Sequence, residues 1–201
     1  MRMSTSFINT IFISIILLSG CASQESRPDK LSQQSIDKAL KETSESDIEK
    51  YRDAIALLGN GKLDKAETAL TEFAEDRPEL AGPWVNLALI NIKRNKLDKA
   101  EHLLQQSLQR NPEMPQAYNL LGYIEKSRNN IIKARDHYIK AVELKHNYAI
   151  AHYNLALLYD IYIQDIGKAV AHYQKYMALT KYKDKRTADW LDQLKATLKK
   201  G

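Results

Sequence analysis

A repeat of about 34 residues limits what this chain of 201 residues can fold into. Ala66, Ala100 and Ala134 are each 34 residues apart, and Ala169 follows 35 residues later. Large apolar residues keep the same step before and after each alanine, and Pro78 closes the first unit. A recurring pattern of small, bulky and proline columns gives every column a packing role, so the period predicts stacked units of one kind.

The columns differ in size, and each size suits one place between helices. Small residues fit where the two helices of a pair cross closely, because a larger side chain would push the backbones apart. Aromatic and leucine columns fill the space between neighbouring units. The residues assigned to repeat packing are Ala66, Trp84, Leu87, Ala88, Ala100, Tyr118, Leu121, Gly122, Ala134, Leu155, Ala156 and Ala169.

This pattern resembles the tetratricopeptide repeat (TPR), a helix–turn–helix unit. The resemblance implies an all-α fold, an α-solenoid of about four units followed by a capping helix. The expected helix pairs are 47–60 with 63–76, 81–94 with 97–110, 115–128 with 131–144, and 149–162 with 166–179. We place the extra residue of the fourth unit in its turn, Ile163-Gln164-Asp165.

These assignments divide the chain into seven parts. The polar tether either stays extended or forms a short helix near 30–42. The first repeat is degenerate, because Lys50 and Asp53 stand where the other repeats have an aromatic residue and a leucine. The parts are a signal peptide at 1–20, a lipidated tether at 21–46, TPR 1 at 47–80, TPR 2 at 81–114, TPR 3 at 115–148, TPR 4 at 149–183 and the capping helix at 184–201.

The N-terminus has the architecture of a secretory signal peptide. Arg2 precedes an apolar stretch from Phe7 to Leu18, which is about a dozen residues long. A membrane-spanning helix needs about 20 apolar residues, so a single-pass anchor is the weaker alternative. Leu18-Ser19-Gly20-Cys21 resembles a bacterial lipobox, in which the cysteine is acylated and the signal is cut in front of it.

The lipobox resemblance implies a lipoprotein whose mature chain begins at Cys21 and carries acyl chains such as palmitate. Two or more acyl chains make membrane attachment stable. The next residue is Ala22, whereas an aspartate would favour retention in the inner membrane. We therefore expect an outer-membrane lipoprotein of the Gram-negative envelope that faces the periplasm.

Composition excludes several classes of protein. A single cysteine in the chain leaves no disulfide scaffold, Cys-based zinc site or iron–sulfur cluster. The net charge of +5 comes from Arg2 and the last 21 residues, since the rest has 22 basic and 22 acidic residues. That basic end either touches anionic lipid or complements the dipole of the last helix. We expect no nucleic-acid partner.

Catalytic and cofactor motifs are missing from the sequence. The histidines His102, His137, His146, His152 and His172 form no HExxH motif, and there is no GxxxxGK[ST] loop. His152 falls in the large packing column, so a structural role fits it best. We expect no enzyme activity, no metal, no cofactor and no small-molecule substrate.

Binding of a protein segment is the expected activity, on a concave surface lined by the first helix of each pair. Apolar residues there suit a peptide or helix ligand, although the segment Leu31 to Leu40 is an alternative occupant. A carboxylate clamp is disfavoured, because Tyr51 and Val85 stand where a basic residue would be needed. The groove candidates are Tyr51, Ile55, Leu58, Val85, Leu89, Ile92, Gln116, Asn119, Tyr123, Lys126, Ile150, Tyr153, Leu157 and Asp160.

The resulting hypothesis is a lipid-anchored periplasmic scaffold. It would bind a segment of another envelope protein and help to assemble or stabilise an envelope machine. In this it resembles TPR lipoproteins of type IV pilus-like, secretion or energy-transduction complexes. The alternative is an adaptor that recruits and regulates a peptidoglycan hydrolase or synthase.

Overall fold

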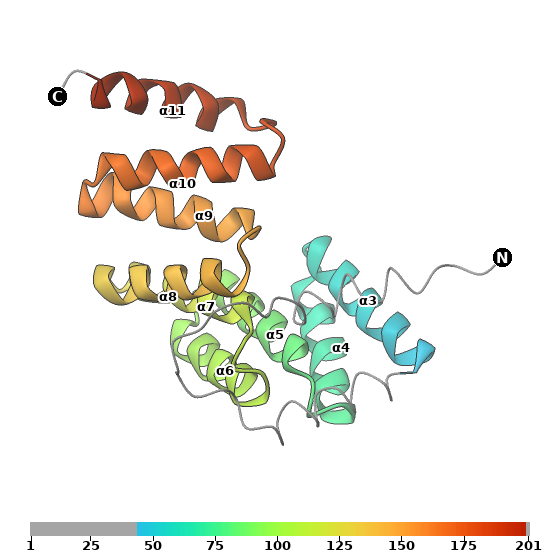
Figure 1. Cartoon of the computed structure of the whole chain (residues 1–201). Coiled ribbons are helices and arrows are strands. Elements are labelled where there is room, and N and C mark those ends of the chain that lie inside the picture. The colour runs from blue at the N-terminus through green and yellow to red at the C-terminus, as the bar shows by residue number, and fades with distance from the viewer. Residues whose placement is uncertain (1–43, 200–201) are drawn as a thin grey trace, which may run out of the picture. The chain divides into compact units, whose positions relative to one another are not determined.

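The computed structural model describes residues 44–199, and in that range it has nine α-helices, one π-helical turn and no strand (Figure 1). The predicted signal peptide, Cys21 and nearly all of the tether lie outside these residues. The helices are α3 (Glu45–Gly59), α4 (Leu63–Asp76), α5 (Ala81–Lys93), α6 (Leu97–Arg110), α7 (Pro115–Ser127), α8 (Ile131–Leu144), α9 (Ala149–Leu157) with the π-helical turn η1 (Leu158–Ile163), α10 (Ile166–Leu179) and α11 (Lys185–Leu198).

The fold class expected from the sequence, an α-solenoid of helix–turn–helix repeats, is confirmed. The observed helix ends lie within two residues of the predicted ones. The chain forms two compact units, 1–114 and 115–201, and their boundary falls between the second and third predicted repeats. In each unit, every helix packs against the next one along the chain. The repeat boundaries themselves stay predictions.

The turns inside the first three helix pairs share one backbone geometry. Gly61, Asn95 and Asn129 have positive φ angles of 72°, 57° and 63°. Glycine and asparagine are the residues that adopt this left-handed conformation most readily, which explains why they recur here. The following residue donates its backbone N–H to the carbonyl five residues back: Lys62 to Leu57, Lys96 to Asn91 and Asn130 to Glu125.

The fourth pair corrects one prediction, because its extra residue lies in the helix and not in the turn at 163–165. Gln164 has the same positive φ, 61°, as its counterparts. However, the N–H of Asp165 donates to the carbonyl of Tyr159, six residues back instead of five. The wider turn of η1 takes up the additional residue, as π-helical insertions do.

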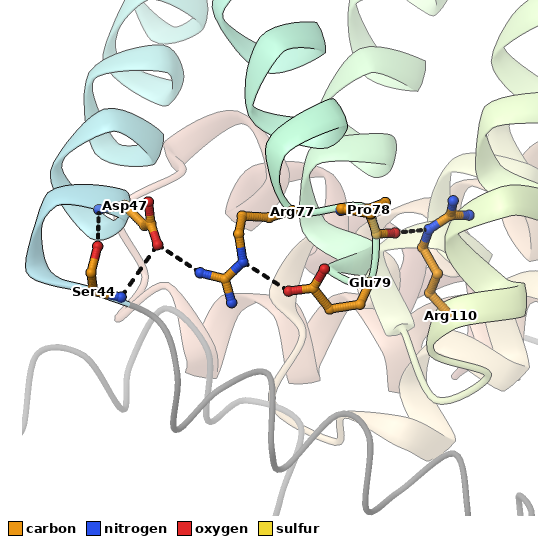
Figure 2. Close-up of polar contacts among 6 residues, drawn as sticks. All are labelled: Ser44, Asp47, Arg77, Pro78, Glu79 and Arg110. Atoms are coloured by element: carbon orange, nitrogen blue, oxygen red, sulfur yellow. Dashed lines mark hydrogen bonds and ion pairs between the residues drawn. The ribbon is translucent and has the colours of Figure 1, made fainter.

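In unit 1, an arginine connects the start of α3 to the loop between α4 and α5 (Figure 2). Arg77 Nη1 lies 2.6 Å from Asp47 Oδ2, and its Nε lies 2.8 Å from Glu79 Oε1. The hydroxyl of Ser44 accepts the backbone N–H of Asp47, and the Asp47 carboxylate accepts that of Ser44. This reciprocal capping satisfies the first turn of α3 and places the carboxylate beside Arg77.

In unit 2, the core lies between α8, α9, α10 and α11. Tyr138, Leu155 and Met177 are fully buried there, and Tyr173 nearly so. Burial of these large side chains supplies the main free energy of folding for the unit. The first turn of α11 is capped by Asp184, which accepts the backbone N–H of Thr187.

Candidate functional site

Most residues assigned to repeat packing lie inside the protein. Ten of the twelve are buried, and Trp84 and Tyr118 are half-buried. The guanidinium of Arg110 lies 4.2 Å from the centre of the Trp84 ring, so the partly open indole face is covered by a cation. These residues hold the helix pairs together and leave the other faces of the leading helices for binding.

Four of the fourteen groove candidates are buried, and for these the groove prediction is wrong: Tyr51, Leu58, Val85 and Asn119. Leu58 and Val85 are apolar side chains whose removal from water stabilises unit 1. Tyr51 stacks on Phe73 with ring centroids 5.1 Å apart. Burial raises the pKa of the Tyr51 hydroxyl, which stays protonated.

Tyr51 and Asn119 take part in one recurring contact between successive leading helices. Asn86 Nδ2 lies 2.7 Å from Tyr51 Oη, and Asn154 Nδ2 lies 2.9 Å from Asn119 Oδ1. In both pairs the partners are 35 residues apart. These amides donate to neighbouring helices, so they hold the repeats in place instead of forming a carboxylate clamp.

The remaining ten candidates have side chains that reach the surface. In unit 1, Ile55 on α3 is exposed. In unit 2, Tyr123 on α7 and Ile150 on α9 are exposed apolar or aromatic residues. The half-buried candidates are Leu89, Ile92, Gln116, Lys126, Tyr153, Leu157 and Asp160.

A cavity of about 450 Å³ in unit 2 brings together three of the predicted residues. It lies where α9 and η1 meet α10 and the first two turns of α11. Its volume is in the range of pockets that bind small molecules or single side chains. The lining consists of Tyr153, Leu157, Asp160, Ile161, Tyr173, Asp184, Arg186, Thr187 and Trp190.

Asp160 is the central polar group of this cavity. Its Oδ2 accepts hydrogen bonds from Trp190 Nε1, at 2.6 Å, and from the Tyr173 hydroxyl, at 3.2 Å. Burial and the nearby carboxylate raise the pKa of the Tyr173 hydroxyl, which therefore remains a donor. The carboxylate thus joins η1, α10 and α11.

Aromatic rings surround this carboxylate on several sides. Tyr153 packs edge-on against Tyr173, with centroids 6.0 Å apart, and lies 4.9 Å from the Tyr176 ring. Trp190 has its N–H held by Asp160 but is 44% exposed, so a ligand can reach its ring. The arrangement offers ordered aromatic surface beside a fixed negative charge.

Sequence reasoning missed the contribution of α11 to this site. Trp190 and Arg186 belong to the segment predicted only to cap the last repeat. Trp190 stands beside, and not within, the apolar stripe of that helix, and this position was the available signal for a second role. Ile161 was also missed, because it belongs to the π-helical turn that the repeat pattern did not predict.

Two histidines join α9 to α10 in the same unit. His152 Nδ1 lies 3.0 Å from His172 Nδ1, and the His172 ring stacks on Tyr159 with centroids 5.8 Å apart. Burial lowers the pKa of His152 and, with His152 nearby, lowers the pKa of His172 to about 4. His152 is buried, which fits its predicted packing role.

Residues 44–199 contain no cluster of three or more potential metal ligands. Within the same range, no helix is both long enough and apolar enough to cross a bilayer.

Sequence and structure comparisons both point to helical repeats. A sequence model of the family described as the tetratricopeptide repeat protein 21 C-terminal ARM domain matches residues 32–171. A search of curated proteins finds no match.

Several solved structures share the fold. A structure from work on Pseudomonas aeruginosa pilF has a TM-score of 0.66 at 16% identity, covering 82% of this chain and 71% of that one. A thermophilic TPR protein of Thermus thermophilus has a TM-score of 0.61 at 18% identity, covering 76% and 82%. The first TPR of Spaghetti (RPAP3), bound to the HSP90 peptide SRMEEVD, has a TM-score of 0.51 at 19% identity, covering 57% and 90%. At these identities the likeness concerns the fold.

Proposed function

The chain belongs to the family of the tetratricopeptide repeat protein 21 C-terminal ARM domain, and from this premise we propose that it is a non-enzymatic scaffold that binds a segment of a partner protein. One observation carries the proposal. The cavity of unit 2 is built from three predicted groove residues, Tyr153, Leu157 and Asp160, together with the exposed Trp190. Aromatic and apolar walls around a few fixed polar groups are typical of sites that recognise peptides.

We further propose that this scaffold is a lipoprotein of the outer membrane and faces the periplasm. The lipobox-like Leu18-Ser19-Gly20-Cys21 supports the anchor, and Ala22 supports the outer membrane. The partner is then an envelope protein, and the role is to assemble or stabilise a pilus-like, secretion or energy-transduction machine. TPR folds bind peptides in other proteins, as in the RPAP3 complex with its HSP90 peptide.

Affinity purification from the native envelope tests the binding role. Tyr123→Glu and Ile150→Glu replace exposed side chains on α7 and α9, so each variant should fold normally yet lose the co-purified partner. Ile132→Glu is the matched control, because this exposed residue lies on α8, the second helix of its pair. Equal recovery with all three variants would contradict the proposal. Recovery of peptidoglycan enzymes would favour the adaptor alternative.

Membrane fractionation tests the anchor separately. Cys21→Ser removes the thiol that would be acylated, and the variant should leave the membrane fraction. Continued sedimentation with membranes after a high-salt wash would contradict lipid anchoring at this residue.

A further inference from the structure

We propose that the unit 2 cavity receives a lysine or arginine side chain of the bound segment, an inference that rests on the proposed function. Asp160 carries it. Both hydrogen bonds to its carboxylate come from neutral groups, the Trp190 indole and the Tyr173 hydroxyl. Among the ion pairs of the described residues, none includes Asp160. A half-buried carboxylate that lines a cavity without a cationic partner is complementary to an incoming cation.

The walls of the cavity suit the rest of such a side chain. Tyr153, Tyr173 and Trp190 place aromatic rings around the carboxylate, and aromatic faces attract ammonium and guanidinium groups. Leu157 and Ile161 provide the apolar surface on which the methylene stem of lysine or arginine can lie. Carboxylate, rings and apolar wall together match every part of a long cationic side chain.

The orientation of these groups is fixed before any ligand binds. The Trp190 N–H and the Tyr173 O–H meet at one oxygen, Asp160 Oδ2, and so tie three helical elements to one atom. The π-helical turn that holds Asp160 interrupts the regular helix, and such turns often occur at functional sites. A preorganised site loses little conformational entropy on binding.

Arg186 is the charge that argues for the opposite occupant. It lines the same cavity but is exposed, whereas Asp160 is half-buried. The third charged group, Asp184, is engaged by Thr187 and by the Tyr176 hydroxyl. The deeper and more desolvated charge decides which side chain enters, since electrostatic contacts strengthen as water is excluded. Arg186 is left to weaken cation binding or to pair with an acidic neighbour on the partner.

Peptide titrations of the full-length protein in detergent micelles test this inference. In a Trp84→Phe background, Trp190 is the only tryptophan, so its fluorescence reports the cavity directly. The probes are three blocked nonapeptides of serine and leucine that differ only in a central lysine, glutamine or glutamate. The lysine peptide should bind about 10-fold more tightly than the glutamine peptide, a difference expected for one charge-assisted contact.

Three variants give the test its sign. Asp160→Asn keeps an oxygen acceptor for Trp190 and Tyr173 and should abolish the preference for lysine. Arg186→Gln removes the competing cation and should tighten binding of the lysine peptide. Asp189→Asn, an exposed carboxylate on α11 outside the cavity, should change nothing.

Two outcomes would overturn the inference. Tightest binding of the glutamate peptide, weakened by Arg186→Gln, would make the occupant anionic. Failure of the lysine peptide to bind better than the glutamine peptide would remove Asp160 from recognition. In either case the co-purification of a partner on the leading helices remains an independent test of the scaffold role.

Discussion

Tyr138 on α8 lies fully buried with its ring against Gly122 on α7. A Cβ atom at Gly122 would lie 2.6 Å from Tyr138 Cε1 and 2.7 Å from Cδ1, closer than real contacts allow. The Tyr138 hydroxyl has no hydrogen-bond partner among the described residues, so packing holds the ring. The absence of one methyl group therefore sets how closely α7 and α8 approach.

Gly122→Ala should destabilise the protein by about 1–3 kcal/mol through overpacking, although alanine favours helix more than glycine. Gly167→Ala on α10 is the matched control. Its Cβ would meet nothing closer than Asp165 Oδ1 at 3.6 Å, so the variant should gain up to about 1 kcal/mol. Urea unfolding measures both changes, and equal stabilisation by the two alanines would refute the close contact.

At the scale of elements, the contact between α9 and α10 depends on the charge state of two histidines. His152 Nε2–H donates to the carbonyl of His146, because a carbonyl can only accept. Neutral His152 therefore accepts at Nδ1, and His172 Nδ1–H donates to it over 3.0 Å. With both rings charged, two N–H donors would face each other, so acid should loosen this helix pair.

The pKa of His172 gives this effect a direction. In the unfolded chain a histidine binds its proton near pH 6.5, whereas folded His172 does so near pH 4. The stability that depends on neutral His172 is therefore complete above pH 6.5 and is lost as the pH falls to about 4. The free energy of unfolding should drop by about 1–3 kcal/mol across this window.

Urea unfolding at a series of pH values measures the slope. In His172→Gln the dependence between pH 6.5 and 4 should become shallower, because one proton-linked group is gone. The slopes of the two proteins should agree above pH 7. An identical slope throughout the range would count against the neutral histidine pair.

Element-scale prediction from sequence was accurate for the helices and less so for the fourth repeat. The turns at Gly61, Asn95 and Asn129 could be located because few residue types adopt positive φ, and helix ends followed from them. The extra residue was placed in a turn because loops usually accept insertions. A π-helical turn has no residue signature of its own, so η1 was not predictable.

At the scale of the whole molecule, charge is distributed unevenly between the two compact units. Unit 1 holds 15 lysine and arginine residues against 17 acidic ones, and unit 2 holds 15 against 8. Long-range attraction to unit 2 therefore favours acidic partners, while Asp160 favours a cation at short range. Long-range fields act mainly on association rates, whereas contacts decide affinity and specificity.

This opposition predicts an unusual salt dependence for the lysine peptide. Its association rate should rise about 2-fold as ionic strength increases from about 20 to about 200 mM, because salt screens repulsion by the positive unit. Stopped-flow Trp190 fluorescence would measure the rate. An acidic peptide should associate more slowly over the same range, and a falling rate for the lysine peptide would argue against an unpaired approach to Asp160.

The sequence by itself determined the repeat period, the helices and the small residues at their crossings. These depend on neighbours within one or two repeats, so a 34-residue pattern records them. Only the tertiary structure decided which leading-helix residues are buried and that Asp160 meets Trp190, 30 residues away. Such contacts depend on how one helix is rotated against another, and a column of similar side chains does not record that rotation. The candidate binding site therefore follows from the structure, while its scaffold follows from the sequence.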